Sequence, residues 1–143
     1  MTTVVIILAI VLLGGSSIAL AIIKYRKRRN TAETKARNLD LAMVQLNQQI
    51  RRSPNDGVAF AKRGIIRHKK GDVKGAIGDL ERAIELDPAN TEARCHHGMA
   101  LQEVGDLKGA ESEFTWIMAH SEDPYFKTAI AKRLKALRVK RRR

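Results

Sequence analysis

Gly-Asp-Val-Lys-Gly-Ala, at residues 71–76, is the stretch that decides the fold, because it returns as Gly-Asp-Leu-Lys-Gly-Ala at 105–110. The two copies are offset by about 34 residues, a repeat period that is typical of stacked helical hairpins. Seven of the eighteen positions from Ala59 to Ala76 are identical to the residue one period further on. Chance would give about one such identity.

Each copy of the stretch predicts a turn between two helices. A glycine with positive φ ends the first helix and the next aspartate caps the second, at Gly71-Asp72 and at Gly105-Asp106. Pro88 ends the second helix, and Pro54, one period upstream, ends an earlier one. Helices are therefore expected at about 57–70, 73–86, 91–104 and 107–120, with a last helix starting at Pro124.

With these elements, residues 35–124 resemble the tetratricopeptide repeat. A complete copy carries the pattern at Phe60, Gly64, Ala76, Leu80, Ala83 and Pro88. A degenerate copy carries it at Gly98, Leu101, Ala110, Phe114 and Ile117, and an upstream half copy at Ala42, Leu46 and Pro54. The departures are basic residues where the family has large apolar ones: Arg63, Arg67, Arg94 and His97. Another kind of helical hairpin pair is the alternative.

The uncharged segment Val4–Ile23 predicts a single transmembrane helix, because twenty helical residues span about 30 Å. The cations that come after it place the N-terminus outside and the rest in the cytoplasm, with the bacterial inner membrane as the expected location. Small residues four apart suggest contact with another membrane helix: Gly15 with Ala19, and Ser17 with Ala21. A cleaved leader is the alternative. The sequence leaves open whether the helix continues past Asn30 into the repeats.

The expected fold class is all-α: this transmembrane helix, a short helical-hairpin solenoid and a basic C-terminal capping helix. The expected domains are an anchor with its basic cluster at 1–30, repeats at 31–123, and a capping helix and tail at 124–143. The repeats divide into a half repeat at 35–54, a full repeat at 56–89 and the degenerate one at 90–123. The capping helix shows one apolar stripe, at Phe126, Ile130, Leu134 and Leu137.

The net charge of +12 belongs to the two ends of the chain. Residues 1–30 hold five cations, residues 124–143 hold nine, and neither segment has an acid, so the middle is slightly acidic. The expected contact is an anionic lipid or an acidic protein partner at Lys24, Arg26, Lys27, Arg28, Arg29, Lys140, Arg141, Arg142 and Arg143. A purely solvating cap is the alternative. Nucleic acid is disfavoured because no aromatic residue alternates with these cations.

No residue pattern points to catalysis. Cys95, His96 and His97 are adjacent on a helix, point about 100° apart and do not converge on a metal ion. We therefore expect no enzyme activity, no cofactor, no metal and no small-molecule substrate. The single cysteine excludes an intrachain disulfide.

The resemblance implies a concave groove lined by the first helix of each hairpin, at Val58, Ala61, Ile65, His68, Lys69, Glu92, Cys95, Met99, Gln102 and Glu103. Ala61 and Ile65 occupy the positions where chaperone-binding members of the family clamp a peptide carboxylate, so that activity is not expected. The predicted function is a membrane-anchored scaffold, an accessory or assembly subunit of a larger membrane complex. The alternatives are a targeting receptor for precursor proteins and a secreted or periplasmic repeat protein.

Overall fold

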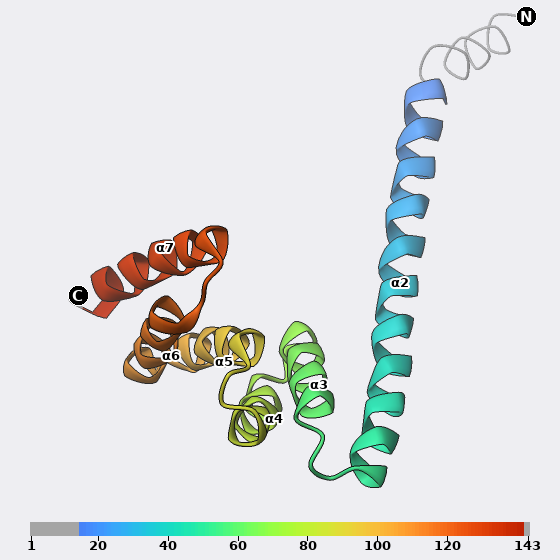
Figure 1. Cartoon of the computed structure of the whole chain (residues 1–143). Coiled ribbons are helices and arrows are strands. Elements are labelled where there is room, and N and C mark those ends of the chain that lie inside the picture. Colours follow the sequence, from blue (N-terminus) through green and yellow to red (C-terminus); the bar gives the residue numbers. More distant parts are fainter. Residues whose placement is uncertain (1–14, 142–143) are drawn as a thin grey trace, which may run out of the picture. The chain divides into compact units, whose positions relative to one another are not determined.

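The computed structural model describes residues 15–141, with side chains from Ile23 onward, and this part of the chain is helical throughout apart from short turns (Figure 1). Two compact units divide at residues 41 and 42, and each is considered by itself. The helices are α2 (Gly15–Arg52), α3 (Gly57–Lys69), α4 (Val73–Leu86), α5 (Thr91–Val104), α6 (Leu107–His120) and α7 (Pro124–Arg141). The four helices expected from the repeat are thus confirmed with both ends within one residue of the prediction, and the last helix begins at Pro124 as predicted.

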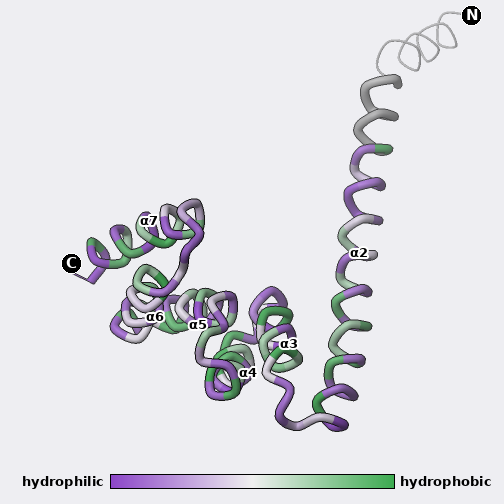
Figure 2. Tube along the Cα trace, in the orientation of Figure 1, coloured by the Kyte–Doolittle hydropathy of each residue, from purple (hydrophilic) through white to green (hydrophobic). Residues whose placement is uncertain are grey.

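Helix α2 is unbroken from Gly15 to Arg52, so the helix continues past Asn30. The structure contradicts the predicted transmembrane helix and the single-pass membrane location. Among residues 15–141, no helix is both long enough and apolar enough to cross a bilayer. Of the predicted span, α2 includes only the residues from Gly15 to Ile23, and the hydrophilic cations at 24–29 follow directly in the same helix (Figure 2). Residues 4–14 of the predicted span lie outside the described residues.

The repeated stretch forms the same turn twice. Gly71 and Gly105 have φ values of 84° and 91°, in the left-handed region that glycine adopts without strain. The Gly75 amide then donates to the Asp72 carboxylate at 3.0 Å, and the Gly109 amide donates to Asp106 at 2.9 Å. Both predicted turns and both predicted N-caps are therefore confirmed.

The core of residues 42–141 is built from small residues that allow the helices to approach closely. Ala76 and Ala110, which end the repeated stretch, are fully buried, as are Ala59 and Ala93. Helix α3 contacts both α4 and α5, and α5 contacts α6. This alternation stacks each hairpin against the next. The buried apolar residues form two clusters, one of α3 and α4 with Ala93 of α5, and one of α6 and α7.

Helix α7 packs on α6 through the predicted apolar stripe. Ile130, Leu134 and Leu137 are buried and belong to one cluster with Phe114 and Ile117. Phe126 packs at the edge of that cluster. The apolar side of α7 therefore covers the last hairpin, as the sequence predicts.

The first basic departure from the family pattern forms a partly buried ion pair. Arg63 on α3 donates to both carboxylate oxygens of Asp79 on α4, at 2.6 and 2.8 Å. Arg67 reaches Asp79 at 2.9 Å, and Arg63 also donates to Asn47 on α2 at 2.9 Å. A polar network thus links the two helices where the family uses apolar packing.

The second hairpin repeats this arrangement one period later. Glu113 takes the place of Asp79, and His97 takes the place of Arg63. His97 Nδ1 lies 3.1 Å from Glu113, and Arg94 donates to the same carboxylate at 2.9 Å. The Arg94 guanidinium also lies 4.0 Å from the centroid of the Trp116 ring, so Trp116 is partly covered. Burial raises the pKa of Glu113, but the His97 and Arg94 interactions outweigh burial and the net shift is downward.

Candidate functional site

Three hollows lie along the first helices of the hairpins. The first, here called the α3 hollow, lies between the end of α2 and α3 and reaches the start of α5. Its walls are mainly the aliphatic side chains of Leu46, Ile65 and Ile66, with polar and charged groups around them. The full lining is Ala42, Gln45, Leu46, Gln49, Lys62, Ile65, Ile66, Lys69 and Glu92. Every residue of this hollow belongs to the unit that starts at Ala42.

The second and third hollows lie between α5 and α7. The Cys95 hollow is at the N-terminal ends of these helices and is lined by Thr91, Glu92, Cys95, His96, Ser121, Asp123 and Phe126. The Arg133 hollow is further along and is lined by Met99, Gln102, Glu103, Arg133 and Lys140. Because Glu92 lines both the α3 hollow and the Cys95 hollow, these two adjoin, and we call the three together the groove.

Residues that line the hollows recur at the repeat period on α3, α5 and α7. Ile65 on α3, Met99 on α5 and Arg133 on α7 are each one period apart, and each lines a hollow. Helix α3 begins at residue 57, and two repeat periods of about 34 residues later the expected start is about residue 125. Helix α7 begins one residue before that, at residue 124. It therefore occupies the place of a first helix in a following hairpin, and it supplies one wall of the groove as well as covering the core.

The structure brings most of the predicted groove residues to these hollows. Ile65, Lys69, Glu92, Cys95, Met99, Gln102 and Glu103 line them. Ala61 is instead buried in the core, and Val58 is exposed and lines none of the three. His68 is mostly covered and lies 3.0 Å from Glu103, so it joins α3 to α5 behind the lining.

Sequence reasoning missed the part of the groove formed outside α3 and α5. Phe126, Arg133 and Lys140 come from α7, and Leu46 comes from α2. The apolar stripe of α7 predicted a cap with its cations turned to solvent, and that interpretation left out the residues that face the groove. The repeat period could have predicted Arg133 as a groove residue, because Ile65, Met99 and residue 133 are equally spaced in the sequence.

Charge along the groove is uneven. Asp123 accepts from the backbone amides of Tyr125 and Phe126, at 2.8 and 3.2 Å, and so caps α7. Glu103 is held by His68. Glu92 is exposed, and no described residue forms a hydrogen bond or ion pair with it. The groove therefore carries four cations, Lys62, Lys69, Arg133 and Lys140, and one carboxylate without a hydrogen-bond or ion-pair partner among the described residues, at the junction of two hollows.

Two titratable groups in the Cys95 hollow have shifted pKa values. Burial raises the pKa of the Cys95 thiol, which keeps it protonated and slow to react. Burial also lowers the pKa of His96, and the neighbouring His68, Lys69 and Arg133 lower it further while Glu92 opposes them. The His96 and His68 rings meet edge to face at 6.0 Å, and His96 Nδ1 is buried without a partner among the described residues. Among the described residues, no group of three or more His, Cys, Asp or Glu side chains is placed so that it could hold a metal ion.

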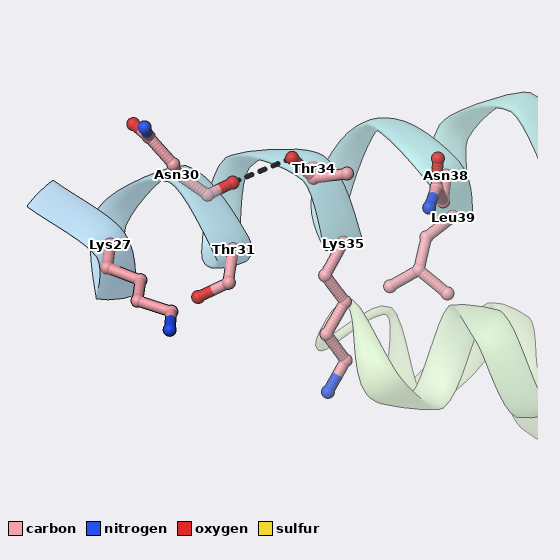
Figure 3. A pocket seen from close by; sticks show the side chains of 7 residues that line it. All are labelled: Lys27, Asn30, Thr31, Thr34, Lys35, Asn38 and Leu39. Atoms are coloured by element: carbon pink, nitrogen blue, oxygen red, sulfur yellow. Dashed lines mark hydrogen bonds between the residues drawn. The ribbon is translucent and has the colours of Figure 1, made fainter.

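A further hollow lies along one face of α2, where Lys27, Thr31, Lys35 and Leu39 succeed each other at intervals of four residues (Figure 3). On the other side, the Thr34 hydroxyl donates to the Asn30 carbonyl at 2.7 Å. All its lining residues belong to the first unit and to a single helix. A face of one exposed helix does not enclose a ligand, and we assign no site to it.

The predicted anionic-contact residues are exposed where the structure describes them. Lys24, Arg26, Lys27 and Arg28 are exposed on α2, whereas Arg29 is paired with Glu33 at 2.7 Å. Lys140 and Arg141 end α7, where Arg141 is paired with Glu111, and residues 142–143 lie outside the described part. Contact with an acidic partner stays a prediction. Gly15, Ser17, Ala19 and Ala21 lie in the first turns of α2, and their role depended on the membrane helix.

No protein-family model matches the chain. Two curated proteins are similar in sequence to part of it. Bacteriophage adsorption protein A of Escherichia coli is 32% identical over 68 residues, which is 48% of this chain. DnaJ homolog subfamily C member 3 of Rattus norvegicus is 31% identical over 77 residues, or 54% of this chain. The matched segments make up only 7% and 15% of those two proteins.

Solved structures are similar to a larger part of the chain. The Yersinia enterocolitica type III secretion translocator chaperone SycD superposes with a TM-score of 0.69 at 20% identity, covering 76% of this chain and 78% of that one. The first TPR of Spaghetti (RPAP3), bound to the HSP90 peptide SRMEEVD, gives 0.69 at 16%, covering 76% and 84%. The Arabidopsis OM64 TPR domain gives 0.64 at 18%, covering 74% and 88%. The chain thus has a TPR-like fold.

Proposed function

We propose that this protein binds a segment of another protein in the groove and acts by that binding, as a scaffold or assembly subunit, without catalysis. The observation that carries the proposal is the set of three hollows lined, at one repeat period, by α3, α5 and α7. Adjoining hollows along stacked helices accept successive side chains of one peptide, whereas an enzyme pocket concentrates polar groups at one point.

Complexes with segments of other proteins are among the similar solved structures. SycD is described with a peptide of the translocator YopD, and the RPAP3 repeat with the HSP90 peptide. Those titles concern those proteins, and the low identities extend only to the fold. They support the proposal because they show that this architecture accepts peptides. The division into a half repeat, a full repeat and a degenerate repeat remains part of the same proposal.

The test uses Cys95, the only cysteine in the chain, as a reporter inside the groove. Short random peptides would be selected against the immobilised full-length chain. The rate of maleimide addition to Cys95 would then be measured with and without each selected peptide. A peptide that occupies the Cys95 hollow slows this addition several-fold, because the thiol must be reached through the same opening.

A matched pair of variants separates the groove from the rest of the surface. Ile66→Asp places a charge in the α3 hollow, whereas Val58→Asp places one on the same helix outside all three hollows. We expect the first variant to abolish peptide binding and the second to retain it. Failure of every selected peptide to protect Cys95, or equal loss in both variants, would refute the proposal.

A further inference from the structure

Glu92 is the residue from which we draw a further inference about the groove, and the inference rests on the function proposed above. Its side chain lies in the first turn of α5 and lines both the α3 hollow and the Cys95 hollow. We propose that the partner segment carries a positively charged side chain between two apolar ones, with the cation on Glu92 and one apolar side chain in each hollow.

The Glu92 carboxylate is available to a charged side chain of a partner. The other glutamates of α5 and α6 are engaged: Glu103 by His68, Glu111 by Arg138 and Arg141, and Glu113 by Arg94 and His97. Glu92 alone among them has no ion-pair partner in the described part of the chain. It is therefore free to meet a charge supplied from outside.

Apolar surface lies on both sides of Glu92, in the two hollows that it lines. Leu46, Ile65 and Ile66 contribute apolar surface to one hollow, and Cys95 and Phe126 contribute to the other. Burying an aliphatic side chain in either hollow removes apolar surface from water, which supplies affinity without requiring a particular charge. The Glu92 carboxylate between them selects the charge at that point, since a cation gains a charge-assisted hydrogen bond there, while Lys62 and Lys69 line the α3 hollow beside it.

A purely structural role for Glu92 is the competing explanation. An acid in the first turn of a helix interacts favourably with the helix dipole and stabilises the helix whether or not a peptide is bound. That role predicts a change in stability when the charge is removed, but no change in which peptides bind. Peptide preference therefore separates the two explanations, and stability does not.

The experiment repeats the peptide selection on the full-length wild type, Glu92→Gln, Glu92→Lys and Glu85→Gln. Glu85 is an exposed glutamate on α4 that lines none of the three hollows, so its variant is the charge-matched control. We expect wild type and Glu85→Gln to select Arg or Lys between apolar residues. Glu92→Lys should select Asp or Glu at that position instead, and Glu92→Gln should weaken wild-type peptides about two- to fivefold.

The outcomes distinguish this inference from the proposed function. If peptides protect Cys95 but Glu92→Lys selects the same sequences as the wild type, the groove binds peptides and the role given to Glu92 is wrong. If no selected peptide protects Cys95, the proposed function itself fails. Reversal of the preferred charge in Glu92→Lys, with unchanged preference in Glu85→Gln, supports the inference.

Discussion

Gly64 on α3 packs against Leu80 on α4 so closely that a Cβ atom at position 64 would lie 2.7 Å from the Leu80 Cγ. The same contact recurs one period later, where a Cβ at Gly98 would lie 2.8 Å from the Phe114 Cε1. Leu80 and Phe114 are both fully buried. Each hairpin thus closes at a point where a large side chain fills the space that glycine leaves.

Gly64→Ala is expected to lower the free energy of unfolding by about 1–3 kcal/mol, because the added methyl group overpacks a filled core. Gly78→Ala is the matched control. Gly78 also lies within a helix, but nothing lies within 4 Å of a Cβ placed there. That substitution should raise the free energy of unfolding by up to about 1 kcal/mol through helix propensity alone. Urea unfolding of both variants, followed by circular dichroism, gives the two signs, and stabilisation by Gly64→Ala would contradict the packing described.

Asp79→Ala is expected to cost about 2–3 kcal/mol, because it leaves Arg63 without its carboxylate at a site where the arginine side chain is only 15% exposed. Glu85→Ala breaks the exposed pair of Glu85 with Arg82 on the same helix as Asp79 and should cost about 0.5 kcal/mol or less. Equal costs in urea unfolding would mean that the Asp79 network contributes no more than a surface pair.

The same network gives a second variant with the opposite expectation. Replacing Arg63 and Asp79 together by leucine restores apolar packing between α3 and α4. Exchanging a buried ion pair for apolar groups of similar size is often close to neutral. The double variant should therefore be more stable than Asp79→Ala alone, and a double variant that unfolds as readily as the single one would argue against this account.

The parts of this fold that sequence reasoning predicts are those set by local chemistry. The repeat period, the positive φ at Gly71 and Gly105, and the two aspartate caps depend on a few neighbouring residues, and all are found. The ion pairs are not local. Arg63 and His97 look like defects in the family pattern until Asp79 and Glu113, each sixteen residues further on, are seen to pair with them.

The transmembrane prediction is wrong for residues 15–141, where no helix is both long enough and apolar enough to cross a bilayer. The described part of the apolar segment belongs to a helix that continues into Lys24 and Arg26 without a break. The groove was predicted in part. Residues on α3 and α5 follow from the family layout, whereas Arg133 was assigned to a cap and its place in the repeat period was overlooked.

Asp106→Ala tests the second copy of the capped turn. The Asp106 carboxylate accepts from the Gly109 amide at the start of α6, and loss of such a cap typically costs about 1 kcal/mol. Asp106→Asn keeps an oxygen acceptor in the same place and should cost less than half as much. Urea midpoints compare the two, and an equal loss in both would show that charge, not the hydrogen bond, is the important property at this position.

His96 makes stability depend on pH, and the sign follows from its environment. Burial, assisted by His68, Lys69 and Arg133, lowers the pKa of His96 below its ordinary value of 6.5. Between these two pKa values the unfolded chain binds more protons than the folded one, so the free energy of unfolding falls as pH falls below about 6.5. His96→Gln should flatten that decline in urea unfolding between about pH 7 and pH 5. If His96→Gln kept the wild-type slope, protonation of His96 would not be the cause of destabilisation at acid pH.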